Sequence, residues 1–306
     1  MSDAVLAQYV RDGVVESEHR GHLLALNADD SVNFALGDPS HLVFPRSTVK
    51  CIQGAAMVAA GMELEPRLLA LGASSHSGSP EHIAGVKEIL ALAKLDESAL
   101  QCMLDKPLGE AERRAWGDAP ATRIAMNCSG KHAAMLLTCV TNGWPIESYL
   151  DAAHPLQVAI KGEIESLAGE TITLTSTDGC GAPLFLLSLA GLARAIRAIT
   201  ISTKPAHQLV MQASRAFPEM VAGKGRLTTQ MISAVPGLYL KDGAEAVEVA
   251  SMTDGRTLVF KVSDGSLRPF RVLVHAGLAK LGIDSPYEVE NVLGGDAIIG
   301  TIRATF

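Results

Sequence analysis

The segment Ser47-Thr48-Val49-Lys50 brings a hydroxyl and an amine within reach of each other. Residues three apart lie on one face of a helix, so Lys50 can approach the Ser47 hydroxyl if this segment is helical. A serine is a weak nucleophile until a base removes its proton, and a partly buried lysine can be that base. A helix start also presents backbone N–H groups to a developing oxyanion. Because this pattern is common by chance, its meaning depends on the rest of the chain.

Two further segments could serve the same chemistry. The stretch Ala73-Ser-Ser-His-Ser77 either places the Ser75 hydroxyl and the His76 imidazole in a cleft or forms a polar loop before a helix. Lys261 lies in an otherwise apolar strand, residues 258–262. It is either a solvent-facing lysine or a base next to a serine.

Two cysteines and a lysine form another candidate group. Cys128 and Lys131 stand at a junction between a loop and a helix, and Cys180 follows Asp178 in a glycine-rich turn. Sulfur and nitrogen donors suit a soft metal such as Zn²⁺, although a lysine must lose its proton to coordinate. Buried, inert thiols are the alternative. Asp178 either orders its own turn or supplies a functional carboxylate.

Composition narrows the classes of protein to consider. The 306 residues carry 26 Lys and Arg against 33 Asp and Glu, a net charge of −7, which argues against nucleic-acid binding. No apolar run approaches the ~18 residues of a membrane span, so we expect a soluble protein without membrane contacts. The first residues lack a signal-peptide pattern, and five cysteines do not suggest a disulfide framework. We therefore expect reduced thiols and a cytoplasmic location.

The sequence predicts strands near both ends of the chain and helices between them, and these elements must position the candidate side chains. Strands are expected at 21–27, 31–36, 237–241, 246–250 and 256–263, and helices at 47–61, 80–95, 129–142, 184–199 and 269–281. Strands at both ends with helices between predict a single α+β domain over residues 1–306. Its antiparallel sheet would come from about 10–40 and 237–283, with a largely helical region over about 47–230.

Taken together, these segments resemble one family, the thermolabile-type L-asparaginases, also called asparaginase II-like proteins. The matching pieces occur in order over about residues 13–283: Val15–His22, Arg46–Lys50, Ala73–Ser77, Asn127–His132, His154-Pro155, Thr177–Cys180, Pro218–Gly223 with Gly225-Arg226, and Lys261. The family is similar in architecture to serine β-lactamases and penicillin-binding proteins. The resemblance implies a serine β-lactamase-like fold with flanking and central helices.

The resemblance also implies an activity, hydrolysis of L-asparagine to L-aspartate and ammonia. It implies two Ser–Lys pairs, Ser47 with Lys50 and Ser75 with Lys261, either of whose serines could be acylated. The substrate-binding residues would be Arg46, His76, Asn127 and Asp178, and the metal ligands Cys128, Lys131 and Cys180. No cofactor is required for this chemistry, and a bound Zn²⁺ would shape the site. The family also suggests a homodimer.

Two other functions remain open at this stage. One is a different acyl hydrolase on the same scaffold, with β-lactamase or peptidase activity. Against it, Val262 and Ser263 follow Lys261, where those enzymes have Thr-Gly after the strand lysine. The other is a protein that binds an amino acid without turning it over, although every proposed catalytic residue is present.

Overall fold

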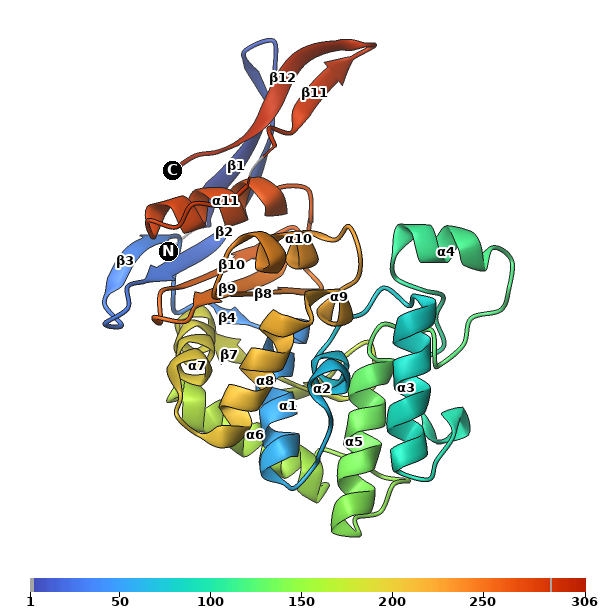
Figure 1. The fold of residues 1–306 in the computed structure, drawn as a ribbon. Coiled ribbons are helices and arrows are strands. Elements are labelled where there is room, and N and C mark those ends of the chain that lie inside the picture. Colours follow the sequence, from blue (N-terminus) through green and yellow to red (C-terminus); the bar gives the residue numbers. More distant parts are fainter. Residues whose placement is uncertain (1–2, 287) are drawn as a thin grey trace.

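An antiparallel sheet built from both ends of the chain organises the structure, a computed structural model that describes residues 3–286 and 288–306 (Figure 1). Its strands are β1 (Ala4–Arg11), β2 (Val14–Leu26), β3 (Val32–Leu36), β8 (Leu238–Gly243), β9 (Val247–Met252), β10 (Thr257–Val262), β11 (Asn291–Gly294) and β12 (Ala297–Ala304). They run in the order β11-β12-β1-β2-β10-β9-β8, and β3 pairs with β2 outside this path. The predicted α+β class and the sheet from both termini are confirmed. The strands β1, β11 and β12 extend the sheet beyond the predicted ranges.

The sheet separates two hydrophobic layers because successive side chains of a strand point to opposite faces. On β10, Val259 packs with the helical region, whereas Leu258 and Phe260 pack under α10 (Leu227–Ala234) and α11 (Phe270–Lys280). The same alternation runs along β9, where Val249 and Ala250 belong to opposite layers. Both faces of the central strands are therefore covered, as Figure 1 shows.

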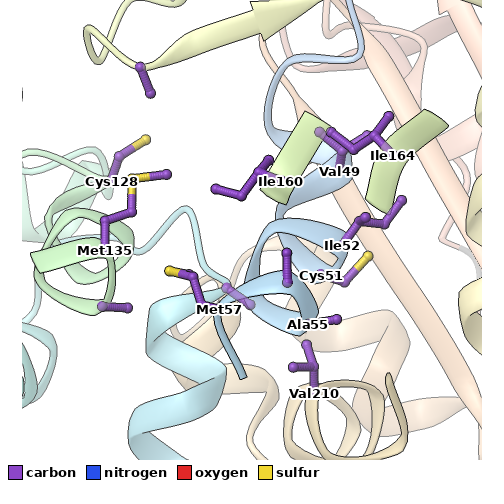
Figure 2. Packing of buried hydrophobic residues seen from close by; sticks show 14 of the residues in the cluster. Val49, Cys51, Ile52, Ala55, Met57, Cys128, Met135, Ile160, Ile164 and Val210 are labelled. Carbon is purple, nitrogen blue, oxygen red and sulfur yellow. The ribbon is translucent and has the colours of Figure 1, made fainter. Parts of the chain in front are cut away.

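The helical region lies against the other face of the sheet. Its helices are α1 (Lys50–Ala59), α2 (Pro66–Gly72), α3 (Pro80–Leu92), α4 (Glu110–Trp116), α5 (Ser129–Asn142), α6 (Pro155–Ala168), α7 (Leu189–Ile201), α8 (Pro205–Ala216) and α9 (Pro218–Val221). Figure 2 shows α1 at the centre of this region, with Ile52 near Ile164 of α6 and Ala55 near Val210 of α8. Within the described residues, no helix combines the length and the apolar character needed to cross a bilayer.

Two helix starts differ from the predictions. Ser47 lies in a 3₁₀ turn, η1 (Arg46–Val49), and the α-helix begins only at Lys50, because the chain enters through Arg46 in a left-handed conformation with φ +52°. The helix predicted from residue 184 begins at Leu189, where the Ser188 hydroxyl accepts from the Gly191 N–H at 2.8 Å. The residues before it form short strands, β6 (Pro183–Phe185) with β5 (Thr175–Thr177) and β7 (Leu187–Ser188) with β4 (Leu42–Val43).

The close packing of α5 on α2 yields a first prediction. A Cβ added at Gly130 would lie 2.6 Å from the Leu71 carbonyl oxygen, so Gly130→Ala should destabilise the fold by about 1–3 kcal/mol despite alanine's higher helix propensity. Gly162 is the matched control, since it is exposed in α6 and an added Cβ would meet nothing within 4 Å. Gly162→Ala should stabilise by about 0.5–1 kcal/mol. Urea denaturation of both variants checks this, and equal shifts would contradict the packing argument.

Candidate active site

A cavity of about 380 Å³ collects polar side chains from segments far apart in the sequence. Its lining residues are Ser47, Ser75, Leu108, Gly109, Glu110, Asn127, Arg226, Asp242, Gly243, Ala244 and Leu267. The edge strand β8 lies directly against the turn that carries Ser47, since a Cβ at Gly243 would stand 3.0 Å from the Pro45 carbonyl oxygen. The structure thus brings both predicted serines to one cavity.

The loop that carries Ser75 is fixed from two sides. The Ser75 N–H donates to the Val221 carbonyl at 3.0 Å, and the His76 N–H donates to the Asn127 carbonyl at 3.0 Å. These bonds tie the segment between α2 and α3 to α9 and to the start of α5. The Ser75 side chain is therefore presented to the cavity on an ordered backbone rather than on a free loop.

Lys50 contacts Ser75 rather than Ser47. Its side chain is 1% exposed, and its Nζ lies 3.0 Å from Ser75 Oγ and 3.0 Å from Cys128 Sγ and also donates to the Ser74 carbonyl. The expected pairing differs because η1 precedes the α-helix, so the three-residue spacing does not follow α-helical geometry. Ser47 is half-buried on the same cavity, whereas Ser75 is 3% exposed.

Lys261 does not pair with Ser75 in this structure. Its Nζ donates to the carbonyl oxygens of Glu245 and Val262, and β10 lies two strands in from the edge of the sheet that borders the cavity. The resemblance implied a pair of Lys261 with Ser75, but the hydrogen bonds of Lys261 go to the backbone around the turn at Glu245.

Lys241, on the edge strand, is a second buried lysine next to the cavity. It is fully buried, and its Nζ contacts the carbonyl oxygen and Oδ1 of Asp242 at 2.6 and 2.8 Å. Burial lowers the pKa of Lys241, and the charge of Asp242 opposes that shift. Lys241 was not among the predicted catalytic lysines, although Lys241-Asp242-Gly243 has the Lys-x-Gly spacing of a strand lysine in penicillin-binding enzymes.

An ion pair between Arg226 and Asp242 completes this wall of the cavity. Arg226 Nη2 lies 2.7 Å from Asp242 Oδ2, and Nη1 donates to the Ser75 carbonyl. Burial would raise the pKa of the Asp242 carboxyl, but the charges of Lys241 and Arg226 hold it well below its usual value. Asp242 is therefore a fixed negative charge at neutral pH. Arg226 lies in a segment that matched the family, but its role was not predicted.

The four predicted substrate-binding residues take different positions. Asn127 lines the cavity. His76 is fully buried, hydrogen-bonded through Nε2 to Ser129 Oγ at 2.9 Å, and burial lowers its pKa well below the usual value. Arg46 and Asp178 form an ion pair at 2.7 Å and are not among the cavity-lining residues. His76 thus anchors the loop to the start of α5 in the protein interior, and we expect no direct substrate contact from it.

The predicted metal ligands do converge. Lys131 Nζ lies 3.2 Å from Cys180 Sγ. A hydrogen bond from Cys128, followed by the Lys131 charge, lowers the pKa of Cys180 well below its usual value. The same hydrogen bond and burial raise the pKa of Cys128. Burial opposes a charge on Lys131, yet the two cysteines raise its pKa. These three side chains therefore lie together as a buried cluster of one amine and two thiols.

Cys128, Lys131 and Cys180 fit a soft metal ion under one condition. Two sulfurs and one amine suit Zn²⁺ once Lys131 and Cys128 have lost their protons. Among the residues that the structure describes, no group of three or more His, Cys, Asp or Glu side chains is arranged to hold a metal, so a metal bound by Cys128 and Cys180 would need Lys131 as its third ligand. On that condition the cluster fits the ion.

Comparisons with known proteins complete the description of the site. No curated protein matches the chain. Among solved structures, a candidate β-lactamase from Bacteroides dorei is 15% identical, with 79% of this chain and 84% of that chain covered and a TM-score of 0.45. A β-lactamase from Mycobacterium bovis is 13% identical (85% and 94% covered, TM-score 0.40), and a Bacillus glutaminase is 12% identical (86% and 91%, TM-score 0.40).

A family model decides the classification. The model described as L-asparaginase II matches residues 7–296, a range that contains every candidate site residue. This match covers the helical region, both serines and the sheet apart from β12 and the first residues of β1. The chain therefore belongs to the L-asparaginase II family.

Proposed function

We propose that this protein hydrolyses the side-chain amide of L-asparagine to L-aspartate and ammonia through a serine–lysine mechanism. Family membership supports an amidohydrolase. The observation that carries the proposal is the contact of Lys50 with Ser75 at 3.0 Å, on the wall of the cavity that also presents Ser47. A hydroxyl held by a buried amine beside a second, more accessible hydroxyl can activate a nucleophile and carry its proton away.

In the proposed reaction, Ser47 is acylated. Its Oγ attacks the amide carbon while its proton passes through Ser75 Oγ to the Lys50 amine, which accepts it in its unprotonated form. The C–N bond then breaks, and the leaving nitrogen takes the proton back along the same path, with the positive charge of Lys241 favouring the charged intermediate. Water attacks the resulting Ser47 ester and gives a proton to the Lys50 amine, and that proton returns through Ser75 to Ser47 Oγ as the ester C–O bond breaks and L-aspartate is released.

Ammonia release from L-asparagine and from L-glutamine by the wild-type protein tests the proposal. We expect turnover of L-asparagine with a preference over L-glutamine, because the family model that matches the chain is described as L-asparaginase II. Turnover of a chromogenic β-lactam without ammonia release from either amide would favour the acyl-hydrolase alternative. Saturable binding of L-asparagine without turnover would make the protein a binding protein.

We also propose that Cys128, Lys131 and Cys180 hold Zn²⁺, an ion that would supply a fixed positive charge at the cluster. Zinc should co-purify in stoichiometric amount, and Cys180→Ala should lose it together with thermal stability. Cys139→Ala is the matched control, since Cys139 is a buried cysteine of α5 outside the cluster and its loss should leave the zinc content unchanged. Elemental analysis and melting temperature are the readouts. Unchanged zinc content in Cys128→Ala would exclude the cluster as the site.

A further inference from the structure

Asp242 and Arg226 place opposite charges side by side on the catalytic cavity. The two side chains are 27% and 22% exposed, so both remain accessible although they are paired. One guanidinium bonds both the Ser75 carbonyl and Asp242 Oδ2. The Arg226 guanidinium therefore bridges the Asp242 carboxylate and the backbone of Ser75, so the carboxylate lies close to Ser75.

Each partner keeps hydrogen-bonding capacity for a ligand. A carboxylate offers about four lone-pair positions. Three of these positions on Asp242 accept hydrogen bonds, from Lys241 Nζ at 2.8 Å, Thr228 Oγ1 at 3.1 Å and Arg226 Nη2 at 2.7 Å. A guanidinium has five N–H donors, of which three have acceptors here, in Ser75, Ala222 and Asp242. One acceptor position and two donors are left.

We propose that this ion pair recognises the amino-acid zwitterion of the substrate, with Asp242 binding the α-ammonium group and Arg226 the α-carboxylate. The inference rests on the proposed function. In L-asparagine the α-carbon is two bonds from the amide carbon, so both charged groups must bind close to the serines. Asp178, which the resemblance implied as a substrate-binding residue, pairs with Arg46 at 2.7 Å and is not among the residues that line the cavity. Asp242 is the acid of the cavity wall that stands next to Ser75.

Substrates that lack one charge test the assignment. Succinamate is L-asparagine without the α-amino group, and 3-aminopropanamide is L-asparagine without the α-carboxylate. Wild-type protein should prefer L-asparagine over both in kcat/KM. Asp242→Asn should reduce the preference over succinamate by about tenfold to a hundredfold, the loss expected for one charge-assisted hydrogen bond. Arg226→Gln should reduce the preference over 3-aminopropanamide in the same way.

A matched control separates this contact from a general charge effect. Glu110 lines the same cavity, but its side chain is 88% exposed and bonds Arg114 at 2.8 Å. Glu110→Gln removes one negative charge at the rim and should leave both preferences unchanged. The readout is a ratio because Asp242 also contacts Lys241, and a merely structural role would slow all substrates equally.

The outcomes are distinct. A selective fall in one ratio for each variant supports the assignment. Equal losses for all substrates, an equal effect of Glu110→Gln, or no preference in the wild type overturns it while leaving the asparaginase proposal intact. If Asp242→Asn does not fold, Arg226→Gln and the wild-type preferences decide. No ammonia from L-asparagine with the wild type overturns the proposed function itself.

Discussion

Ammonia release from L-asparagine by Ser47→Ala should fall by about a thousandfold or more, the loss typical of removing a covalent nucleophile. Ser47 is half-buried on the cavity, in the 3₁₀ turn before α1. The other hydroxyl of that turn, Thr48 Oγ1, is fully buried and donates to the Pro45 carbonyl at 2.7 Å, so the variant should also fail to accumulate an acyl adduct. Steady-state ammonia assays and intact-mass spectrometry after rapid acid quench provide the two readouts.

Ser75→Ala separates the two serines. Because Ser75 contacts Lys50 at 3.0 Å, its loss should also slow turnover strongly, but a slow adduct should still form on Ser47. Peptide mapping locates the adduct. An adduct on Ser75 in the Ser47→Ala protein would exchange the roles of the two serines, an alternative that the sequence leaves open. Ser77→Ala, in the same loop, is the control that should keep the adduct on Ser47.

The second large effect is expected on substituting Lys241, the lysine of the edge strand. Lys241→Met should lower kcat/KM by about a hundredfold to ten-thousandfold, the range for loss of a group that aids proton transfer or stabilises charge. Methionine preserves most of the buried volume at this fully buried position. The loss should appear mainly in kcat, because Lys241 contacts Asp242 and the backbone rather than the open cavity.

Lys261→Met is the matched control, with the same substitution on the same sheet. Lys261 donates to the carbonyl oxygens of Glu245 and Val262, so its loss should leave kcat/KM close to that of the wild type. A collapse of activity in Lys261→Met, with Lys241→Met unaffected, would restore the pairing of Lys261 with Ser75. Circular dichroism of both variants confirms that each is folded.

Periodicity and turn residues predicted most of the fold. The strands at 237–241, 246–250 and 256–263 appear as β8, β9 and β10, because short apolar runs buried on both faces are bounded by Gly or Asp-Gly turns. The C-terminal strands β11 and β12 were not predicted. Their side chains are largely exposed, so they lack the hydrophobic pattern that marks a buried strand.

The candidate site was predictable only in part. Motif spacing along the chain located Ser47, Lys50 and Ser75, and the structure brings them to one place. Which strand lysine lies next to the cavity depends on strand order, and β8 is the edge strand although it is not at either end of the chain. The Lys-x-Gly spacing at Lys241 is the local pattern that could have indicated it. The homodimer and the cytoplasmic location stay predictions.

The order of strands in the sheet also sets when the site can form during synthesis. β2 pairs with β10, more than two hundred residues later, and β1 lies between β2 and β12. Contacts of such separation close late and slow the folding of a domain. The segments that carry Ser47, Lys50 and Ser75 leave the ribosome long before β8 delivers Lys241 and Asp242. A nascent chain therefore holds both hydroxyls before it holds the charges proposed to select the substrate, and catalytic competence is expected to arise only after β8 and β10 have been synthesised.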